Sequence, residues 1–405
     1  MMYTMICNMV PGKIDMPQSR LRATFMRGGT SKAVVIHRAD LPASTADWAP
    51  IFLAILGSPD PNGRQLDGMG GGVSSLSKIC VVGPPSRPDA DIDYTFAQVS
   101  VGSAAVDYSA NCGNMCSAIG PWAVDEGLVA APAHGEALVR IHNTNTHKMI
   151  HARFPVENGM AAVEGDLVLD GVAGSGAPVR LDFQDPGGAR TGFLLPTGNA
   201  ADILGIPGFG PVEVSVVDAA NPCVFVAASS LGASGIELPD ELDASPALLA
   251  KLEAIRCAAS VAMGLATSYA AARAVLGVPK VALVSGPSAS ATLSARRLAP
   301  EDMDITVRMI SIGQPHRAVP LTGALCLAVA CRVPGTIPWR LARAQNGPLR
   351  IGHPSGIVLV DARIETRGAG VHVLHATVHR TARRLFQGEV LYRRTTPVDP
   401  AMAAA

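Results

Sequence analysis

The feature of this sequence that most constrains its fold is an internal duplication. Three segments recur about 200 residues later, in the same order along the chain, with similar apolar and small residues. The matched pairs are Lys32–Leu41 with Pro222–Leu231, Ser77–Pro84 with Pro279–Gly286, and Gly113–Ile119 with Gly323–Val329. One such match could arise by chance, whereas three in order favour duplication. We therefore predict two similar domains, residues 16–193 and 194–393.

Within each half the sequence predicts many short strands and few helices. The chain contains 41 Gly and 31 Pro, and runs of alternating or β-branched residues lie between these turn formers. The predicted strands are 22–26, 32–37, 78–83, 93–101, 137–142, 161–170, 212–218, 223–228, 280–285, 304–310, 350–360 and 370–379. The predicted helices are 46–56, 113–125, 246–263 and 321–331. We expect an α+β fold in which each domain wraps a mostly antiparallel, barrel-like sheet around one apolar helix, the first starting at Gly113 and the second at Thr322–Gly323.

Composition and charge exclude several classes of protein. Hydrophobic residues make up 48% of the 405 residues and charged residues 16%, which is typical of a globular protein and not of a disordered one. The 33 Lys and Arg residues balance 33 Asp and Glu residues, so no net field attracts nucleic acid or an anionic membrane surface. No uncharged apolar stretch reaches the roughly 18 residues of a spanning helix. We expect neither nucleic acid nor membrane as a partner.

The cysteines and the chain ends bear on location. Eight cysteines occur without CxxC pairs or the spacing of a disulfide framework, which predicts a reduced, cytoplasmic protein. Residues 1–15 lack the basic segment and the apolar run of a signal peptide. We expect residues 1–15 and 394–405 to be disordered extensions.

Two residues stand out as candidates for chemistry. Cys112 lies in Asn111-Cys-Gly-Asn114, directly before an apolar helix whose first amides are unpaired and whose dipole stabilises a thiolate or a bound carboxylate. A structural interpretation is equally available, namely a buried cysteine beside an ordinary helix cap. Lys78 begins an apolar strand after a Gly- and Ser-rich loop, as a desolvated general base would. The alternative is a lysine at a strand end with its ammonium group in water.

Other signals do not indicate a metal or a nucleotide. The glycine-rich segments 68–72 and 205–210 lack the features of phosphate-binding loops. His372, His375 and His379 have metal-ligand spacing for a helix, but the valines between them predict a strand that separates them onto both faces. We therefore expect no metal and no cofactor.

Several motifs together resemble one known family. These are Met26-Arg-Gly-Gly-Thr-Ser-Lys32, Gly57-Ser-Pro-Asp60, Asn111-Cys-Gly-Asn114, Leu195-Pro-Thr-Gly-Asn199 and Gly313-Gln-Pro-His-Arg317 with Thr322-Gly-Ala324. The chain is similar over about residues 19–391 to the PrpF family, which includes isomerases of 2-methylaconitate, 3-methylitaconate and 4-oxalomesaconate. The resemblance implies a diaminopimelate-epimerase-like fold with the active site in the cleft between two similar domains.

The resemblance also implies roles for individual residues. It makes Lys78 and Cys112 the catalytic pair that removes and returns an allylic proton without a cofactor. It assigns substrate binding to Arg27, Thr30, Ser31, Asn111, Gly113, Asn114, Lys280, His316, Arg317, Thr322 and Gly323. The implied substrate is a small unsaturated tricarboxylate of the 2-methylaconitate or aconitate type, and 4-oxalomesaconate or 3-methylitaconate is the alternative. A homo-oligomer and a dehydratase partner in propionate catabolism, through the 2-methylcitrate cycle, are also possible implications.

Two other classes of function remain open at this point. An amino-acid epimerase of the same fold uses one cysteine from each domain, but the turn Val319-Pro-Leu-Thr-Gly323 has no thiol before its glycine. A non-catalytic binding protein with the same cleft would not need both Lys78 and Cys112. Cys116 and Cys326, at matching places in the two helices, are expected to be core residues.

Overall fold

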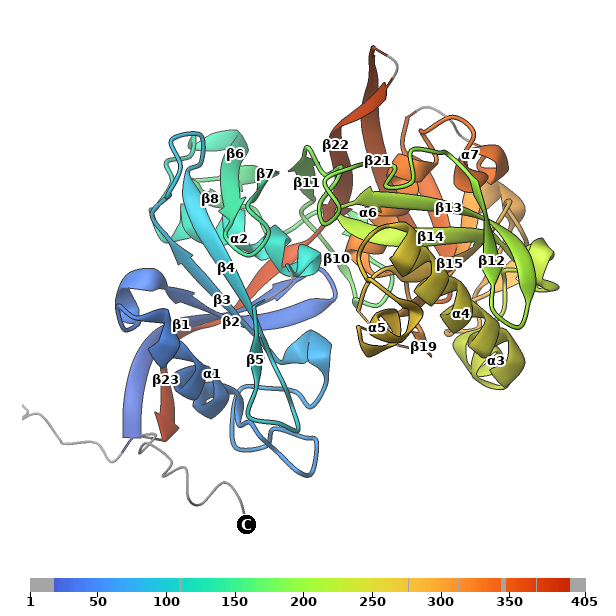
Figure 1. Cartoon of the computed structure of the whole chain (residues 1–405). Helices are drawn as coiled ribbons and strands as arrows, with labels where there is room; N and C mark the ends of the chain where they lie inside the picture. The colour runs from blue at the N-terminus through green and yellow to red at the C-terminus, as the bar shows by residue number, and fades with distance from the viewer. Residues whose placement is uncertain are drawn as a thin grey trace, which may run out of the picture.

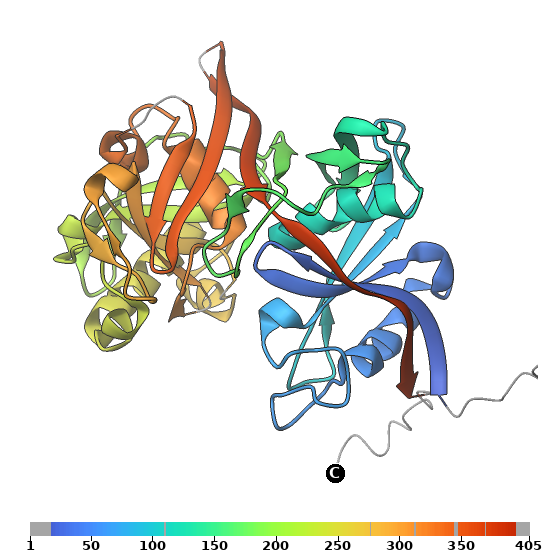
Figure 2. The same ribbon diagram turned by 180° about the vertical axis from the view of Figure 1, so that it is seen from behind.

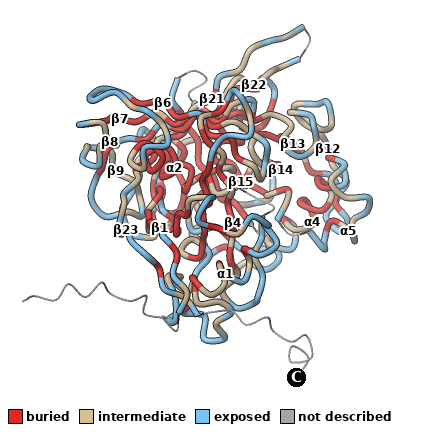
Figure 3. The backbone as a smooth tube through the Cα atoms, turned by 90° about the vertical axis from the view of Figure 1, so that its left-hand side faces the viewer, coloured by how far each residue is buried: buried red, intermediate tan, exposed pale blue. Residues whose placement is uncertain are grey.

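The computed structural model describes residues 18–108, 111–275, 277–311, 313–343, 347–368 and 370–393. The predicted extensions 1–15 and 394–405 lie outside these ranges. Strands hold more of the described residues than helices do, and a 19-stranded sheet runs through two lobes that lie side by side in Figure 1. The backbone is buried inside and exposed outside, as Figure 3 shows. The α+β class is confirmed.

The first lobe is built from one run of strands paired in chain order. They are β1 (Gln18–Gly28), β2 (Ser31–His37), β3 (Lys78–Gly83), β4 (Ile92–Val99), β6 (His134–Asn143), β7 (Lys148–Glu157) and β11 (Val179–Gln184). The successive pairings are antiparallel, parallel, antiparallel, parallel, antiparallel and antiparallel.

The second lobe repeats this order. Its strands are β13 (Gly210–Ala219), β14 (Asn221–Ala227), β15 (Lys280–Ser285), β18 (Ile305–Ser311), β20 (Leu349–His353), β21 (Gly356–Arg367) and β22 (Gly370–Arg380). Their pairings follow the same series of antiparallel and parallel neighbours. The predicted duplication is therefore visible in the topology, since β2, β3 and α2 (Gly113–Asp125) correspond to β14, β15 and α6 (Leu321–Ala330).

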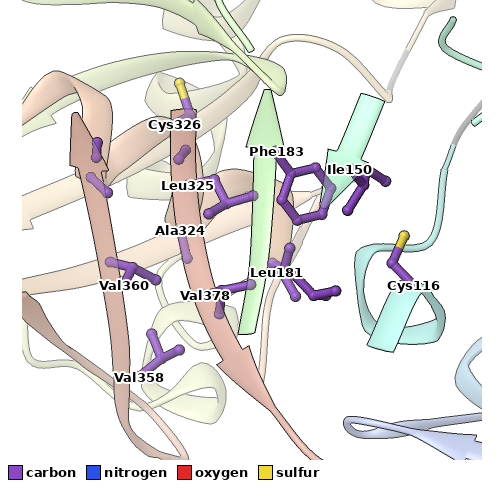
Figure 4. Packing of buried hydrophobic residues seen from close by; sticks show 14 of the residues in the cluster. Cys116, Ile150, Leu181, Phe183, Ala324, Leu325, Cys326, Val358, Val360 and Val378 are labelled. Atoms are coloured by element: carbon purple, nitrogen blue, oxygen red, sulfur yellow. The ribbon is translucent and has the colours of Figure 1, made fainter. Parts of the chain in front are cut away.

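Each lobe encloses one apolar helix. Eleven residues of α2 and nine of α6 are buried, because these helices are apolar on every side and strands surround them. A single hydrophobic cluster extends from α2 through β11 to α6 and β21, so the two lobes share one core (Figure 4). Cys116 and Cys326 lie fully buried in it, as predicted.

The lobes are joined at two places. β11 pairs antiparallel with β22, so the last strand of one repeat lies beside the last strand of the other. The chain then crosses back, because β23 (Ala382–Arg393) pairs along its length with β1 (Figure 2). Residues 382–393, which the predicted second domain includes, thus lie in the first lobe.

The remaining elements cover the outside or connect the strands. The other helices are α1 (Trp48–Leu56), α3 (Pro239–Asp243), α4 (Pro246–Ala262), α5 (Tyr269–Ala274) and α7 (Ile337–Leu341). The short strands are β5 (Val106–Asp107), β8 (Met160–Ala161), β9 (Leu167–Val168), β10 (Ser175–Gly176), β12 (Asp202–Ile206), β16 (Ser290–Ala291), β17 (Arg297–Leu298) and β19 (Gln314–Pro315). The 3-10 turns are Arg38–Asp40, Thr45–Asp47, Ser74–Leu76, Ala228–Leu231 and Pro300–Asp302. No described helix is long and apolar enough to cross a membrane.

The four predicted helices are confirmed within about two residues, but some strand predictions are wrong. The predicted strand 161–170 holds only the two-residue strands β8 and β9. The predicted strand 350–360 is a hairpin, since the chain turns between His353 and Gly356. The strands β7, β11, β12 and β23 were not predicted. The prediction missed a regular alternation of buried and less buried residues in β7, in which Pro155 occupies a less buried position. β23 is an arginine-rich, largely exposed strand.

The contact between α2 and β7 gives a test of this packing. A Cβ atom at Gly120 would lie 2.9 Å from both Ala152 Cβ and Phe154 Cε1, so Gly120→Val overpacks the first lobe. We expect it to lower the free energy of unfolding by about 1–3 kcal/mol. The same change at Gly102, where nothing lies within 4 Å, is the control and should cost less than about 0.5 kcal/mol. Urea denaturation measures both, and equal costs would contradict the packing.

Candidate active site

A cavity of about 370 Å³ lies between the two lobes. The start of α2 and the start of α6 meet there, because a Cβ atom at Gly113 would lie only 2.4 Å from Leu321 Cδ2. Gly113 is thus required for the approach of the two helices. Both helices direct unpaired N–H groups and the positive end of their dipoles toward the cavity.

Lys78 lies at the first position of β3 and is only 7% exposed. Its Nζ atom donates to Gln98 Oε1 at 2.5 Å and lies 5.0 Å from the centre of the Phe96 ring. The Gln98 amide is itself fixed, since its Nε2 atom donates to the carbonyls of Ser74 and Ser77. Among the residues that the structure describes, no carboxylate forms an ion pair with Lys78. The ammonium group therefore lies in an apolar and amide environment at the cavity wall, and not in water.

Cys112 is the N-cap residue of α2 and is half-buried at the cavity. Its extended backbone places its carbonyl to accept a hydrogen bond from Cys116 N–H at 3.2 Å. Behind it lies Cys80, whose pKa is raised by burial; Cys112 adds to this rise and Lys78 opposes it, so both residues lie near Cys80. Lys78 and Cys112 thus belong to one wall of the cavity.

The cavity lining is strongly cationic. Lys78 and Lys148 come from the first lobe, Lys280 from the second, and Arg190 from the segment that joins them. Lys148 is also within 3.7 Å of Asp185, which does not line the cavity. Among the described residues that line the cavity there is no Asp or Glu. Such a lining fits a small molecule with several carboxylates.

Burial lowers the pKa values of two residues that line the cavity, Lys280 and His316. Burial at the start of β15 lowers the pKa of Lys280. Burial also lowers the pKa of His316, and the neighbouring Lys280 adds to this effect. His316 Nδ1 accepts a hydrogen bond from Ala318 N–H at 3.1 Å, so the neutral ring carries its proton on Nε2. His316 can therefore donate to a carboxylate without being charged.

The structure brings together most of the predicted site residues. Ten of the thirteen line the cavity: Thr30, Ser31, Lys78, Asn111, Cys112, Gly113, Asn114, Lys280, His316 and Thr322. The repeat explains part of this set, because Lys78 and Lys280 begin the equivalent strands β3 and β15 in opposite lobes.

Three predicted residues do not line the cavity. Arg27 Nη1 donates to Gly29 O, Thr381 O and Thr381 Oγ1. These hydrogen bonds hold the guanidinium group within the lobe junction. Arg317 is 69% exposed and lies 3.9 Å from Asp240. Gly323 lies inside α6, where a Cβ atom would be 2.5 Å from Met309 Sδ. Gly323 thus serves helix packing.

Several lining residues had no signal in the sequence. Lys148 is placed by the start of β7, and its Nζ atom donates to Asp185 O at 2.8 Å. Arg190 is placed by the buried carboxylate of Asp218, which accepts from the amides of Arg190 and Thr191. The other unpredicted polar lining residues are Ser74, Ser75, Thr146, Gln184 and Asn221. Ser74, Ser75 and Thr146 lie in connections between strands, whereas Gln184 ends β11 and Asn221 begins β14.

The discounted features lie elsewhere. His372, His375 and His379 lie on a strand, β22, as predicted. Among the described residues no three His, Cys, Asp or Glu side chains gather into a metal-ligand set. A larger open depression of about 1380 Å³ lies beside α1, but its lining has no Lys, Cys or His that could transfer a proton.

Comparison of sequences relates this chain to isomerases. Residues 18–393 match the model of the family described as PrpF protein. The 3-methylitaconate isomerase of Eubacterium barkeri is 40% identical over 377 residues, covering 92% of this chain and 97% of that protein. The 2-methyl-aconitate isomerase of Shewanella oneidensis is 38% identical, covering 93% and 98%. The (4E)-oxalomesaconate Delta-isomerase of a Novosphingobium strain is also 38% identical, covering 90% and 96%.

Comparison of structures confirms the fold. A crystal structure of methylitaconate-delta-isomerase superposes with a TM-score of 0.85 at 38% identity, covering 95% of this chain and all of that one. A hydroxyproline epimerase from Agrobacterium vitis superposes with a TM-score of 0.53 at 12% identity, covering 94% of each chain. The second likeness shows that the epimerase-like fold is shared.

The exposure of Cys112 predicts selective alkylation. Cys112 is half-buried, whereas the other six described cysteines are buried. Among the seven described cysteines, iodoacetamide should therefore modify Cys112 first in the folded protein, and tricarballylate, a saturated tricarboxylate that suits the cationic lining, should protect it. Peptide mass spectrometry locates the label, with the unfolded protein as the control in which all cysteines react. Earlier labelling of Cys80 or Cys116 would contradict this geometry.

The lowered pKa of Lys280 predicts a pH effect on anion binding. The ammonium form binds carboxylates, and it is lost as pH rises through a pKa that burial has lowered below the usual 10.5. Tricarballylate affinity should therefore fall by about tenfold toward alkaline pH, the cost of one charge-assisted hydrogen bond.

Calorimetric titration between pH 7 and pH 10 measures this effect. Lys280→Arg should remove most of the fall, because a guanidinium stays charged. Lys148→Arg, on the more exposed lysine of the same cavity, is the matched control and should leave the fall in place. An unchanged pH profile in Lys280→Arg would refute the assignment.

Proposed function

This chain belongs to the PrpF family, and we propose that it isomerises a small unsaturated tricarboxylate by moving one allylic proton. The observation that carries the proposal is the cavity itself. A proton-transfer pair, Lys78 and Cys112, lies in a lining with three further cationic side chains, those of Lys148, Arg190 and Lys280, and no described acidic residue. Three carboxylates of one ligand match this excess of positive charge.

The chemistry follows from the substrate class. Carboxylates conjugated to a double bond acidify the neighbouring allylic C–H, and removal of that proton leaves a dienolate with its charge spread over several oxygens. The helix starts at Gly113 and Leu321 and the cationic side chains are already in place to stabilise that charge. We propose that no cofactor takes part, because these fixed groups supply the stabilisation.

Lys78 and Cys112 divide the proton transfer between them. One removes the proton at one end of the allylic unit, and the other returns a proton at the far end. Return at a different carbon moves the double bond. Rotation of the dienolate before return converts cis to trans.

The substrate we favour is of the 2-methylaconitate or aconitate type. Its three carboxylates suit a lining that carries lysine and arginine side chains from both lobes. 4-Oxalomesaconate or 3-methylitaconate is the alternative. Ile150, Phe183 and Val319 supply apolar surface in the same cavity for a methyl group.

An amino-acid epimerase is less consistent with the cavity. The start of α6 presents Pro320, Leu321 and Thr322, so no second thiol faces Cys112 across the cleft. The described lining also has no carboxylate to receive a substrate ammonium group.

We further propose a cytoplasmic location and a place in propionate catabolism, beside the dehydratase that supplies the substrate. No disulfide joins the seven cysteines within the described ranges, which supports a reducing compartment. The place in that pathway depends on 2-methylaconitate being the substrate.

Proton NMR in deuterium oxide tests the function. The panel is 2-methylaconitate, aconitate, 3-methylitaconate, 4-oxalomesaconate and, as controls, proline and diaminopimelate. Deuterium entering an allylic position of one acid, with formation of its isomer, is the expected result. Exchange at an amino-acid α-carbon would support the epimerase. Absence of any exchange would favour a binding protein.

The catalytic pair gives the mutational prediction. Lys78→Ala and Cys112→Ser should each reduce turnover by at least ~100-fold, the scale of a positioned acid or base, while the fold is kept. Cys116→Ser, one helical turn into the core, is the control and should mainly reduce stability, since it buries a hydroxyl. Turnover with the substrate from the panel measures this, and near-normal rates in Cys112→Ser would remove the cysteine from the mechanism.

A further inference from the structure

Arg380 is a buried cation that no step of the proposed reaction uses. It is the last residue of β22, at the point where the chain leaves the second lobe for β23. The residue is only 8% exposed, and burial lowers the pKa of its guanidinium to about 10. The side chain is therefore held in the interior at the lobe junction.

The contacts of Arg380 lead to the cavity. Its Nε atom donates to Asn114 Oδ1 at 3.1 Å, and its Nη1 atom donates to His379 O at 2.9 Å. Asn114 lies in the first turn of α2, lines the cavity, and donates from Nδ2 to Thr30 Oγ1 at 3.1 Å. Arg380 thus accounts for the orientation of the Asn114 amide, with its oxygen toward the guanidinium and its nitrogen toward Thr30.

The surroundings contain positive charge without a negative partner. Among the described residues no carboxylate forms an ion pair with Arg380 or with Arg27, whose pKa is also lowered, first by burial and then by Arg383. Two histidines interact with Arg380. His353 is neutral because burial and nearby arginines lower its pKa to about 3, and burial also lowers the pKa of His379. The start of α2 adds the positive end of its dipole. Burying cations together in this way is unfavourable unless an anion arrives.

We propose that Arg380 is a positioning residue of this active site, which fixes Asn114 and maintains behind the start of α2 a positive charge that the bound carboxylates neutralise. This inference rests on the proposed function, since it requires an anionic substrate. The same inference explains why the crossing of the chain matters for the site: Arg380 belongs to the second half of the sequence, and it contacts a helix of the first half.

Arg308 shows what a purely structural buried arginine looks like in this protein. It is 1% exposed, and burial likewise lowers its pKa to about 10. Its bonds all go to backbone carbonyls of the second lobe, those of Ile236, Glu237 and Val307, and it does not line the cavity. Arg308→Lys is therefore the matched control for Arg380→Lys.

The test measures the binding of tricarballylate by calorimetry and the melting temperature of each variant. Arg380→Gln removes the charge and should weaken binding by at least ~10-fold, the low end for loss of a preorganised electrostatic contact. Arg380→Lys keeps the charge and should lose less. Arg308→Lys should melt at a lower temperature yet bind tricarballylate as the unmodified protein does.

A double-mutant cycle tests the route through Asn114. If Arg380 acts through this side chain, Arg380→Lys should cost little further affinity in a protein that already carries Asn114→Ala. Independent, multiplying effects would refute the positioning role. If Arg380→Gln does not fold, the double-mutant cycle with Arg380→Lys still tests the positioning role of Arg380.

The remaining outcomes separate this inference from the proposed function. Normal tricarballylate affinity in a folded Arg380→Gln variant would overturn the inference and leave the proposed function intact. If the unmodified protein itself fails to bind tricarballylate and exchanges no panel acid, the proposed function fails and the inference falls with it.

Discussion

The pairing of β11 with β22 is the interaction on which the rest of the structure depends. These strands end the two repeats, and each would otherwise leave an open sheet edge. Their pairing, reinforced by a buried hydrogen bond from Thr377 to Asp182 at 2.6 Å, merges two small cores into one. It also brings the starts of α2 and α6 to one point, and Phe183 and Gln184 at the end of β11 line the cavity formed there.

The crossing of the chain after this pair has a second consequence. β23 returns to β1, so the turn that carries Thr30 is held by Thr381, whose carbonyl accepts from Gly29 N–H at 2.9 Å. Gly29 is required here because a Cβ atom would lie 2.4 Å from Asn114 Oδ1. Residues from both ends of the sequence therefore determine the geometry at the start of α2. Neither lobe contains a complete cavity.

The electrostatics of the cavity favour an anionic ligand. Lysine and arginine side chains converge on it from both lobes, its described lining has no Asp or Glu, and two helix dipoles add to their effect. Such an arrangement favours the binding of several carboxylates. The same fixed charges are then already oriented for the charge that develops during proton transfer, which is the condition for electrostatic catalysis.

The sequence by itself determined the features that depend on local residue patterns. The duplication predicted two equivalent lobes, the apolar runs predicted α2 and α6, and the resemblance selected Lys78, Cys112 and eight other residues that line the cavity. Only the tertiary structure showed that Lys148 and Arg190 line the cavity and that Arg380 lies behind it. It also showed that Arg27 is hydrogen-bonded within the lobe junction, that Gly323 packs against Met309, and that Arg317 is exposed. Strand and helix periodicity depend on neighbours along the chain, so they can be read from the sequence. The charge around a cleft depends on which distant segments the pairing of β11 with β22 and of β23 with β1 brings together, and no local pattern contains that information.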